Sequence, residues 1–207
     1  MNRNYNAVEQ LLNHQENDWQ KYLKYRREIY QRLMDTEVKG NMISEANWIL
    51  RRKCSCSEDR GIFVKPGDVV FLDYGQAYLN EMGYQHFGII MSICRRKALI
   101  IPMTSNPLHY RNAYDAEENP AGKIHLMRLG KLEGMTRESV LYLNDLKYIN
   151  TARIIRVIAH LDTDSELFRK IRERMQEIMF SYDVVQSCHE QNLSGQGDMA
   201  GSGVGRS

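Results

Sequence analysis

A short stretch of the chain holds side chains that could carry acid-base chemistry. His86 has an imidazole that can give or take a proton near neutral pH, and Glu81 precedes it in the same segment. Thr104 and Ser105 add two neighbouring hydroxyls. General acid-base catalysis needs a base, an acid and hydrogen-bond donors that stabilise developing charge, and these groups could supply them. The same residues could also be a half-buried strand histidine, strand-end hydroxyls bonded to backbone and an exposed loop carboxylate.

Three short strands must position these residues. Residues 69–72 and 87–93 are almost wholly apolar, and a basic turn leads from the second run into a third at 98–103. Strands this close in sequence form a meander, so the start of the second strand, at His86, can approach the end of the third. That end carries Thr104, Ser105 and Asn106.

Further elements complete a small domain. Strand-like segments follow at residues 123–127 and 139–143, and many short strands favour a small SH3-like β-barrel. Thr163 and Glu166 form a capping box that opens an amphipathic helix reaching Tyr182. The predicted fold class is therefore α+β, with a helix at the C-terminal end of the barrel.

A helical extension precedes the barrel. Apolar residues recur at helical spacing through residues 6–37, Gly40 and Asn41 interrupt the pattern, and Ser44 starts a shorter helix that ends in the basic cluster 51–53. We expect a helical extension at 1–60, a barrel domain at 61–186 and a disordered tail at 187–207. The tail is rich in Gln, Asn, Gly and Ser without apolar periodicity, so burial cannot offset its ordering entropy.

Composition limits the partners and the compartment. The 28 basic and 26 acidic side chains give a net charge of only +2, so affinity for nucleic acid must come from local clusters. The apolar runs are too short to cross a bilayer, and the polar first residues place the chain in the cytoplasm. Cys54 and Cys56 have no second pair at metal-binding spacing, so we predict free thiols, no metal and no cofactor.

The order of features resembles the MazF/PemK family of mRNA interferases, the toxins of toxin-antitoxin systems. The matching segments are GDVVFLDY at 67–74, NEMGYQHFGIIMS at 80–92 and IIPMTS at 100–105. In that family a Gly-Asp strand leads into a Glu-x-Gly loop, a second apolar strand, and a third strand ending in Pro, an apolar residue, Thr and Ser. Residues 138–150, 154–161 and 162–179 resemble the later strands and terminal helix. The likeness spans roughly 65–179 and implies a MazF-like barrel.

This resemblance implies a metal-independent endoribonuclease that cleaves single-stranded RNA, works as a homodimer and is held in check by an antitoxin. It assigns proton transfer to His86 and a phosphate-orienting hydroxyl to Thr104, with Glu81 either polarising His86 or holding the loop. The chain has His86 and Phe87 where many members have Arg and Pro. Roles that a related toxin gives to an Arg and an acid fall on Tyr142 and Asn144, and are not carried over.

Other residues are candidates for RNA contact. Tyr74, Tyr78 and Tyr84 could stack on unpaired bases, with Tyr84 as the predicted contact, since such stacking contributes about 1 to 3 kcal/mol. Core packing or loop anchoring is the commoner use of tyrosine. Arg111 and Lys147 could contact the RNA backbone. Ser105 and Asn106 complete the predicted RNA-binding set.

Two alternatives stay open. The same barrel could be a non-catalytic toxin or regulator that binds a protein target, as a related gyrase-poisoning family does. The helical extension could instead act as an intramolecular inhibitor or an assembly domain, because an amphipathic helix could fill the groove that an antitoxin would occupy.

Overall fold

The computed structural model describes residues 15–180 of the 207-residue chain, and the predicted disordered tail at 187–207 lies outside this range. Two helices come first, α2 (Gln15–Tyr30) and α3 (Asp35–Arg51), and two follow later, α4 (Pro107–Asn112) and α5 (Glu166–Phe180). Short 3-10 turns occupy Ser57–Arg60 and Thr151–Arg153. The strands are β1 (Asp68–Asp73), β2 (Gln85–Cys94), β3 (Lys97–Thr104), β4 (Ala113–Tyr114), β5 (Lys123–Gly130), β6 (Ser139–Tyr142), β7 (Lys147–Asn150) and β8 (Ile154–His160).

All eight strands join one sheet, which confirms the α+β class. Its order is β4-β5-β6-β3-β2-β1-β8, with β7 paired to β3 beside β6. Among the described strands the two end strands, β4 and β8, do not pair with each other, so the sheet is not closed. Bulges interrupt the β1–β8, β2–β3 and β5–β6 ladders, and bulges increase strand twist and bending.

The two faces of the sheet are covered differently. Because successive strand residues point to opposite faces, odd-numbered positions of β1, β2, β3 and β6 share one side. Helix α5 packs on that side through Phe168, Ile171 and Met175, whose spacing places them on one helix face. Even-numbered residues of β1 to β3 form a second core on the other side, and α4 covers a third, smaller cluster through Tyr110.

The break between the two helices of the extension lies at a different place from the predicted one. We expected a break at Gly40 and Asn41, but α3 runs through both, and the break lies at residues 31–34. Glu37 accepts a hydrogen bond from the Met34 backbone N–H at 3.0 Å, which caps α3 there. Gly40 lets the ring of Tyr84 pack closely on α3, because a Cβ at this position would lie only 3.1 Å from that ring. The Gly-Asn pair is therefore a packing feature rather than a helix end.

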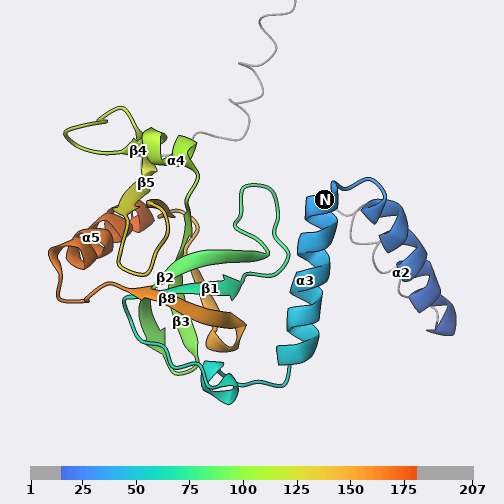
Figure 1. The fold of residues 1–207 in the computed structure, drawn as a ribbon. Coiled ribbons are helices and arrows are strands. Elements are labelled where there is room, and N and C mark those ends of the chain that lie inside the picture. The colour runs from blue at the N-terminus through green and yellow to red at the C-terminus, as the bar shows by residue number, and fades with distance from the viewer. Residues whose placement is uncertain (1–14, 181–207) are drawn as a thin grey trace, which may run out of the picture.

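Helix α3 lies beside the sheet, and α2 lies beyond it (Figure 1). The contact centres on the buried carboxylate of Asp73, at the end of β1. Ser44 and Asn47 of α3 donate hydrogen bonds to its two oxygens at 2.8 and 2.9 Å, and the Gly75 N–H and Gln85 amide donate at 2.9 and 3.0 Å. A side-chain network thus joins the extension to the strand that begins the sheet.

Two local predictions after β3 were incomplete. The polar stretch at 105–122, for which the sequence predicts no helix or strand, contains α4 and β4. The last helix begins at Glu166, and its cap is Ser165, whose Oγ accepts from the Phe168 N–H at 3.2 Å, rather than Thr163. Tyr182, predicted as the end of this helix, lies outside the described residues.

Candidate functional site

The strand register sets His86 and Thr104 on one face of the sheet. In the β2–β3 ladder Phe87 pairs with Met103 and Gly88 with Pro102, so one residue further along each strand His86 comes opposite Thr104. Directly opposed residues of an antiparallel pair point to the same side. An imidazole and a hydroxyl therefore share the rim of the sheet that α5 leaves uncovered.

His86 is exposed, yet its surroundings still affect its titration. Partial desolvation by neighbouring protein lowers the pKa of the imidazole below its ordinary value. Among the residues from 15 to 180, no hydrogen-bond partner occupies the ring. A neutral imidazole with unused nitrogens can accept a proton from a bound molecule.

A second histidine lies on the other side of Thr104. Strand β6 pairs with β3 next to Thr104, and the Tyr142 hydroxyl of β6 lies 3.3 Å from Nδ1 of His109 in α4. The two rings also meet edge to face, with centroids 5.6 Å apart. The pKa of Tyr142 is raised above its ordinary value, mainly by burial. A hydrogen bond with Thr104 opposes this shift, and the charge of Asp145 adds to it. Thr104, Tyr142 and His109 thus form one continuous polar cluster.

Asn106 and Ser105 connect this cluster to α4. The Asn106 N–H donates to Thr104 Oγ1 at 3.2 Å, and its side chain accepts from the Leu108 N–H at 2.9 Å as the helix cap. Ser105 is exposed between them. This turn fixes the orientation of the Thr104 hydroxyl and places His109 in the first turn of the helix.

Glu81 belongs to a clamp on the loop between β1 and β2. Its carboxylate lies 3.8 Å from Lys147 Nζ and accepts weakly from the Tyr78 N–H at 3.4 Å. Lys147 also donates to the Met82 carbonyl at 3.0 Å, and Asp145 accepts from the Met82 N–H at 2.7 Å. These contacts match the loop-holding alternative for Glu81, and they involve Lys147 in the same clamp.

The remaining predicted contacts are spread around the site. Tyr84 lies with its ring against Gly40 and its hydroxyl 2.7 Å from the Asn41 amide, so both its face and its polar end are already in contact with α3. Arg111 is exposed on α4. Tyr78, in the same loop as Tyr84, has 87% of its surface exposed and offers a free ring.

Sequence reasoning missed His109, and it set Tyr142 aside because a related toxin has Arg at that place. A signal for His109 did exist: Asn106 followed by Pro107 is a helix-start pattern, and it places His109 in the first turn of a helix. The contact of His109 with Tyr142 spans 33 residues, and no local pattern encodes it.

Three further features of residues 15–180 concern metal ligands, thiols and membrane-spanning helices. In that range no group of three or more His, Cys, Asp or Glu side chains could hold a metal ion. Cys54, Cys56 and Cys94 are free thiols, and Cys188 lies outside the range. No helix in the described part of the chain is long and apolar enough to span a bilayer.

Comparison with known proteins gives matches only among solved structures. No protein-family model matches the chain, and no curated protein matches it either. A crystal structure of MazF from Deinococcus radiodurans matches with a TM-score of 0.41 and 13% identity, over 56% of this chain and 96% of that one.

Two mycobacterial structures match to a similar extent. The Mycobacterium tuberculosis toxin MazF-mt6 has a TM-score of 0.38 and 10% identity, over 54% of this chain and 95% of that one. A mycobacterial endoribonuclease in complex with its cognate antitoxin has a TM-score of 0.39 and 9% identity, over 58% of this chain and 99% of that one. The chain is similar to MazF toxin structures over a little more than half its length.

Proposed function

We propose that this protein is a metal-independent endoribonuclease that cleaves single-stranded RNA. The observation that carries the proposal is the position of His86 opposite Thr104, with the Tyr142–His109 pair on the other side of Thr104. The sequence resemblance of residues 65–179 to the MazF/PemK family supports the same activity. Two histidines beside two hydroxyls supply every group that the reaction needs.

The proposed reaction begins at the 2′-hydroxyl of the RNA. His86, whose pKa is lowered by desolvation, is neutral at pH 7 and takes the proton from this hydroxyl. The 2′-oxygen then forms a bond to phosphorus while the bond from phosphorus to the 5′-oxygen breaks. His109 supplies a proton to the departing 5′-oxygen, and the reaction leaves a 2′,3′-cyclic phosphate on the other fragment. Thr104 and Tyr142 donate hydrogen bonds to the phosphate oxygens as charge gathers there.

Neighbouring residues would hold the RNA strand. In this proposal Lys147 and Arg111 attract backbone phosphates, and Ser105 and Asn106 donate to the strand beside Thr104. Glu81 holds the β1–β2 loop through Lys147 rather than acting on His86. Tyr84 keeps that loop on α3 and contributes indirectly, while exposed Tyr78 offers the ring for stacking.

The biological setting follows from the sequence resemblance alone. We propose that the protein is the toxin of a toxin-antitoxin pair, acts in the cytoplasm as a homodimer, and has a protein antitoxin as its partner. Size-exclusion chromatography with light scattering tests the dimer, and a single mass equal to one chain would contradict it.

Cleavage in EDTA tests the enzymatic proposal. Purified protein incubated with mixed RNA should cut it, and His86→Ala should abolish the cuts. His160→Gln is the matched control, because His160 pairs with Asp68 at the opposite end of β1. Equal cutting by the wild type and His86→Ala would mean a wrong site or a contaminating nuclease. No cutting by the wild type, together with capture of a protein target, would favour the non-catalytic alternative.

A further inference from the structure

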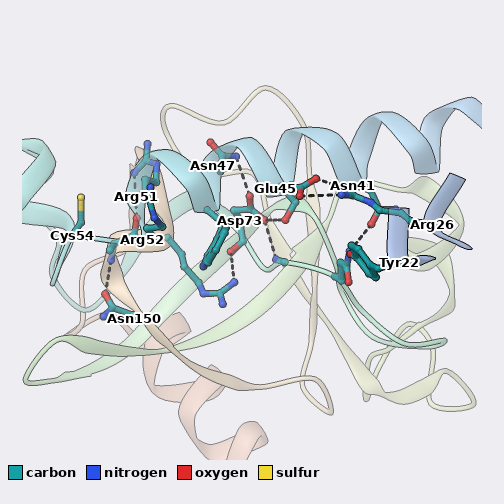
Figure 2. A pocket seen from close by; sticks show the side chains of 16 residues that line it. Tyr22, Arg26, Asn41, Glu45, Asn47, Arg51, Arg52, Cys54, Asp73 and Asn150 are labelled. Carbon is teal, nitrogen blue, oxygen red and sulfur yellow. Dashed lines mark hydrogen bonds and ion pairs between the residues drawn. The ribbon is translucent and has the colours of Figure 1, made fainter. Parts of the chain in front are cut away.

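A pocket outside the proposed active site lies between α3 and the end of β1, and α2 closes one side of it. Its volume is about 470 Å³, within the range of roughly 300 to 1,000 Å³ that small-molecule sites occupy. Figure 2 shows Arg51, Arg52 and Cys54 at one end, Arg26 and Tyr22 at the other, and Asp73 between them. Helices α2 and α3 supply half of the residues that line it, and both helices lie outside the segment that resembles the MazF/PemK family.

The carboxylates of this pocket are already satisfied. Glu45 forms an ion pair with Arg26, which accounts for one cation and one anion. Asp73 accepts four hydrogen bonds from neutral donors. These donors are neutral, so the charge of Asp73 remains and offsets one cation of the wall. Four arginines still face two carboxylates, which leaves the wall with a net charge of +2.

Three guanidinium groups of the wall have no carboxylate bonded to them. Within residues 15–180, Arg51, Arg52 and Arg153 form no ion pair with a carboxylate, although all three line the pocket. Arg51 donates to the backbone carbonyls of Ala152 and Ile154 at 3.2 and 2.9 Å. Arg153 donates to the carbonyls of Asp73 and Tyr74 at 3.3 and 3.0 Å.

These contacts fix Arg51 and Arg153 without cancelling their charge, since carbonyl oxygens are neutral. Burial lowers the pKa of Arg51, the nearby charge of Arg60 lowers it further, and the charge of Asp73 opposes both only in part. A bound anion would therefore stabilise the charged form of Arg51. Arg52 bonds only to the Ile49 carbonyl of its own helix, and its side chain is exposed at the pocket edge. Guanidinium groups bind phosphate by paired hydrogen bonds, which makes phosphate the best-matched anion.

An aromatic surface lies beside these cations. Trp48 lines the pocket and has 63% of its surface exposed, and Tyr22 lines it with 42% exposed. A bare indole beside unpaired guanidinium groups is suited to a ligand that combines a flat ring with a phosphate. We propose that this pocket binds a nucleotide, with its phosphate on Arg51, Arg52 and Arg153 and its base on Trp48. The nucleotide is either free or the phosphorylated end of an RNA strand.

The observations favour a nucleotide over an acidic peptide segment. A peptide carboxylate would use the cations but would leave the indole without a stacking partner. Base stacking on an aromatic ring contributes about 1 to 3 kcal/mol, and phosphate contacts add to it. The proposal does not depend on whether the chain cleaves RNA.

Equilibrium dialysis with the full-length His86→Ala protein tests the pocket without interference from cleavage. AMP should bind saturably, and adenosine or inorganic phosphate alone should bind at least tenfold more weakly. Arg52→Glu and Trp48→Ala should each weaken AMP binding at least tenfold. Their matched controls are Lys53→Glu and Leu50→Ala, which change exposed neighbours that do not line the pocket and should leave AMP binding unchanged.

Competition identifies the source of the nucleotide. If a 5′-phosphorylated RNA oligomer displaces AMP and its 5′-hydroxyl counterpart does not, the pocket holds a strand end. If neither displaces AMP, it holds a free nucleotide. The proposal is overturned if AMP shows no saturable binding at millimolar concentration, if Arg52→Glu binds AMP as the parent does, or if only an acidic peptide binds in an Arg52-dependent manner.

Discussion

At the scale of single residues, the hydroxyl of Thr104 connects the two histidines of the proposed active site. Its Oγ1 accepts from the Asn106 N–H, and in the proposed reaction its hydrogen bond with Tyr142 is exchanged for one donated to a phosphate oxygen. Thr104→Val keeps the shape of the side chain and removes this donor. We expect the cleavage rate to fall about 100-fold to 1,000-fold, the loss found when one donor to a developing oxyanion is removed.

Thr104→Ser provides the control for this prediction. It restores the donor without the methyl group and should recover most of the rate in a single-turnover assay with labelled RNA. An equally slow Thr104→Ser would mean that packing of the methyl group, rather than the hydroxyl, explains the loss.

The pH dependence of cleavage also belongs to the residue scale. If His86 is the base, it must be neutral to act, and desolvation lowers its pKa below the ordinary value of 6.5. The neutral form therefore persists to lower pH than in an ordinary histidine, and activity is lost only as the pH falls through the lowered pKa. In a profile of kcat/KM against pH, the midpoint of the acidic limb should lie below about 6.5. A midpoint above that value contradicts the assignment of His86 as the base.

At the scale of elements, the β1–β2 loop is held by the segment between β6 and β7. Asp145 accepts from the Met82 N–H at 2.7 Å and lies 3.3 Å from Lys147, which bonds the Met82 carbonyl. Asp145→Ala removes the acceptor, and hydrogen bonds to charged groups contribute about 1.5 to 3 kcal/mol. Amide hydrogen exchange at Met82 should become roughly tenfold faster or more. Asp164→Ala, in an exposed turn before α5, is the control and should leave the exchange rate at Met82 unchanged. An unchanged rate in Asp145→Ala would show that the clamp does not hold the loop.

The contact between α3 and β1 makes a second prediction at this scale. Removing Ser44 and Asn47 as donors, by Ser44→Ala together with Asn47→Ala, leaves the buried Asp73 carboxylate with two fewer hydrogen bonds. Because an ionised group that loses partners in a buried site is costly, the free energy of unfolding should fall by about 2 to 4 kcal/mol. Urea denaturation measures it.

Glu58 is exposed and takes no part in the network around Asp73, so Glu58→Ala is a suitable control. If the double variant were as stable as the parent, the hydrogen bonds from α3 to Asp73 would contribute nothing net.

At the scale of the whole molecule, the helical extension contributes to stability through α3. Arg51 also reaches the carbonyls of Ala152 and Ile154, so the extension contacts both β1 and the segment before β8. A chain starting at Gly61 should therefore melt at lower temperature than the full chain and should not cleave RNA faster per folded molecule. Thermal melting and cleavage assays on both chains measure this. A truncated chain that stays folded and cleaves faster would support the inhibitory role of the extension instead.

The sequence by itself determined the local parts of this protein. The strands of the meander lie where their apolar runs predicted, because neighbouring strands joined by short turns have few alternative pairings. The same short connection sets His86 opposite Thr104. The amphipathic spacing of Phe168, Ile171 and Met175 likewise predicted the face of α5 that packs on the sheet.

Only the tertiary structure decided the contacts between distant segments. His109 reaches Tyr142 across 33 residues, and Ser44 reaches Asp73 across 29, and no periodic pattern marks such pairs. Gly40 shows the physical reason. The Gly-Asn pair predicts a helix end, yet α3 continues through it, and the ring of Tyr84, 44 positions further along, packs closely against the glycine. Local propensities amount to about 1 kcal/mol per residue, so packing between distant segments can override them.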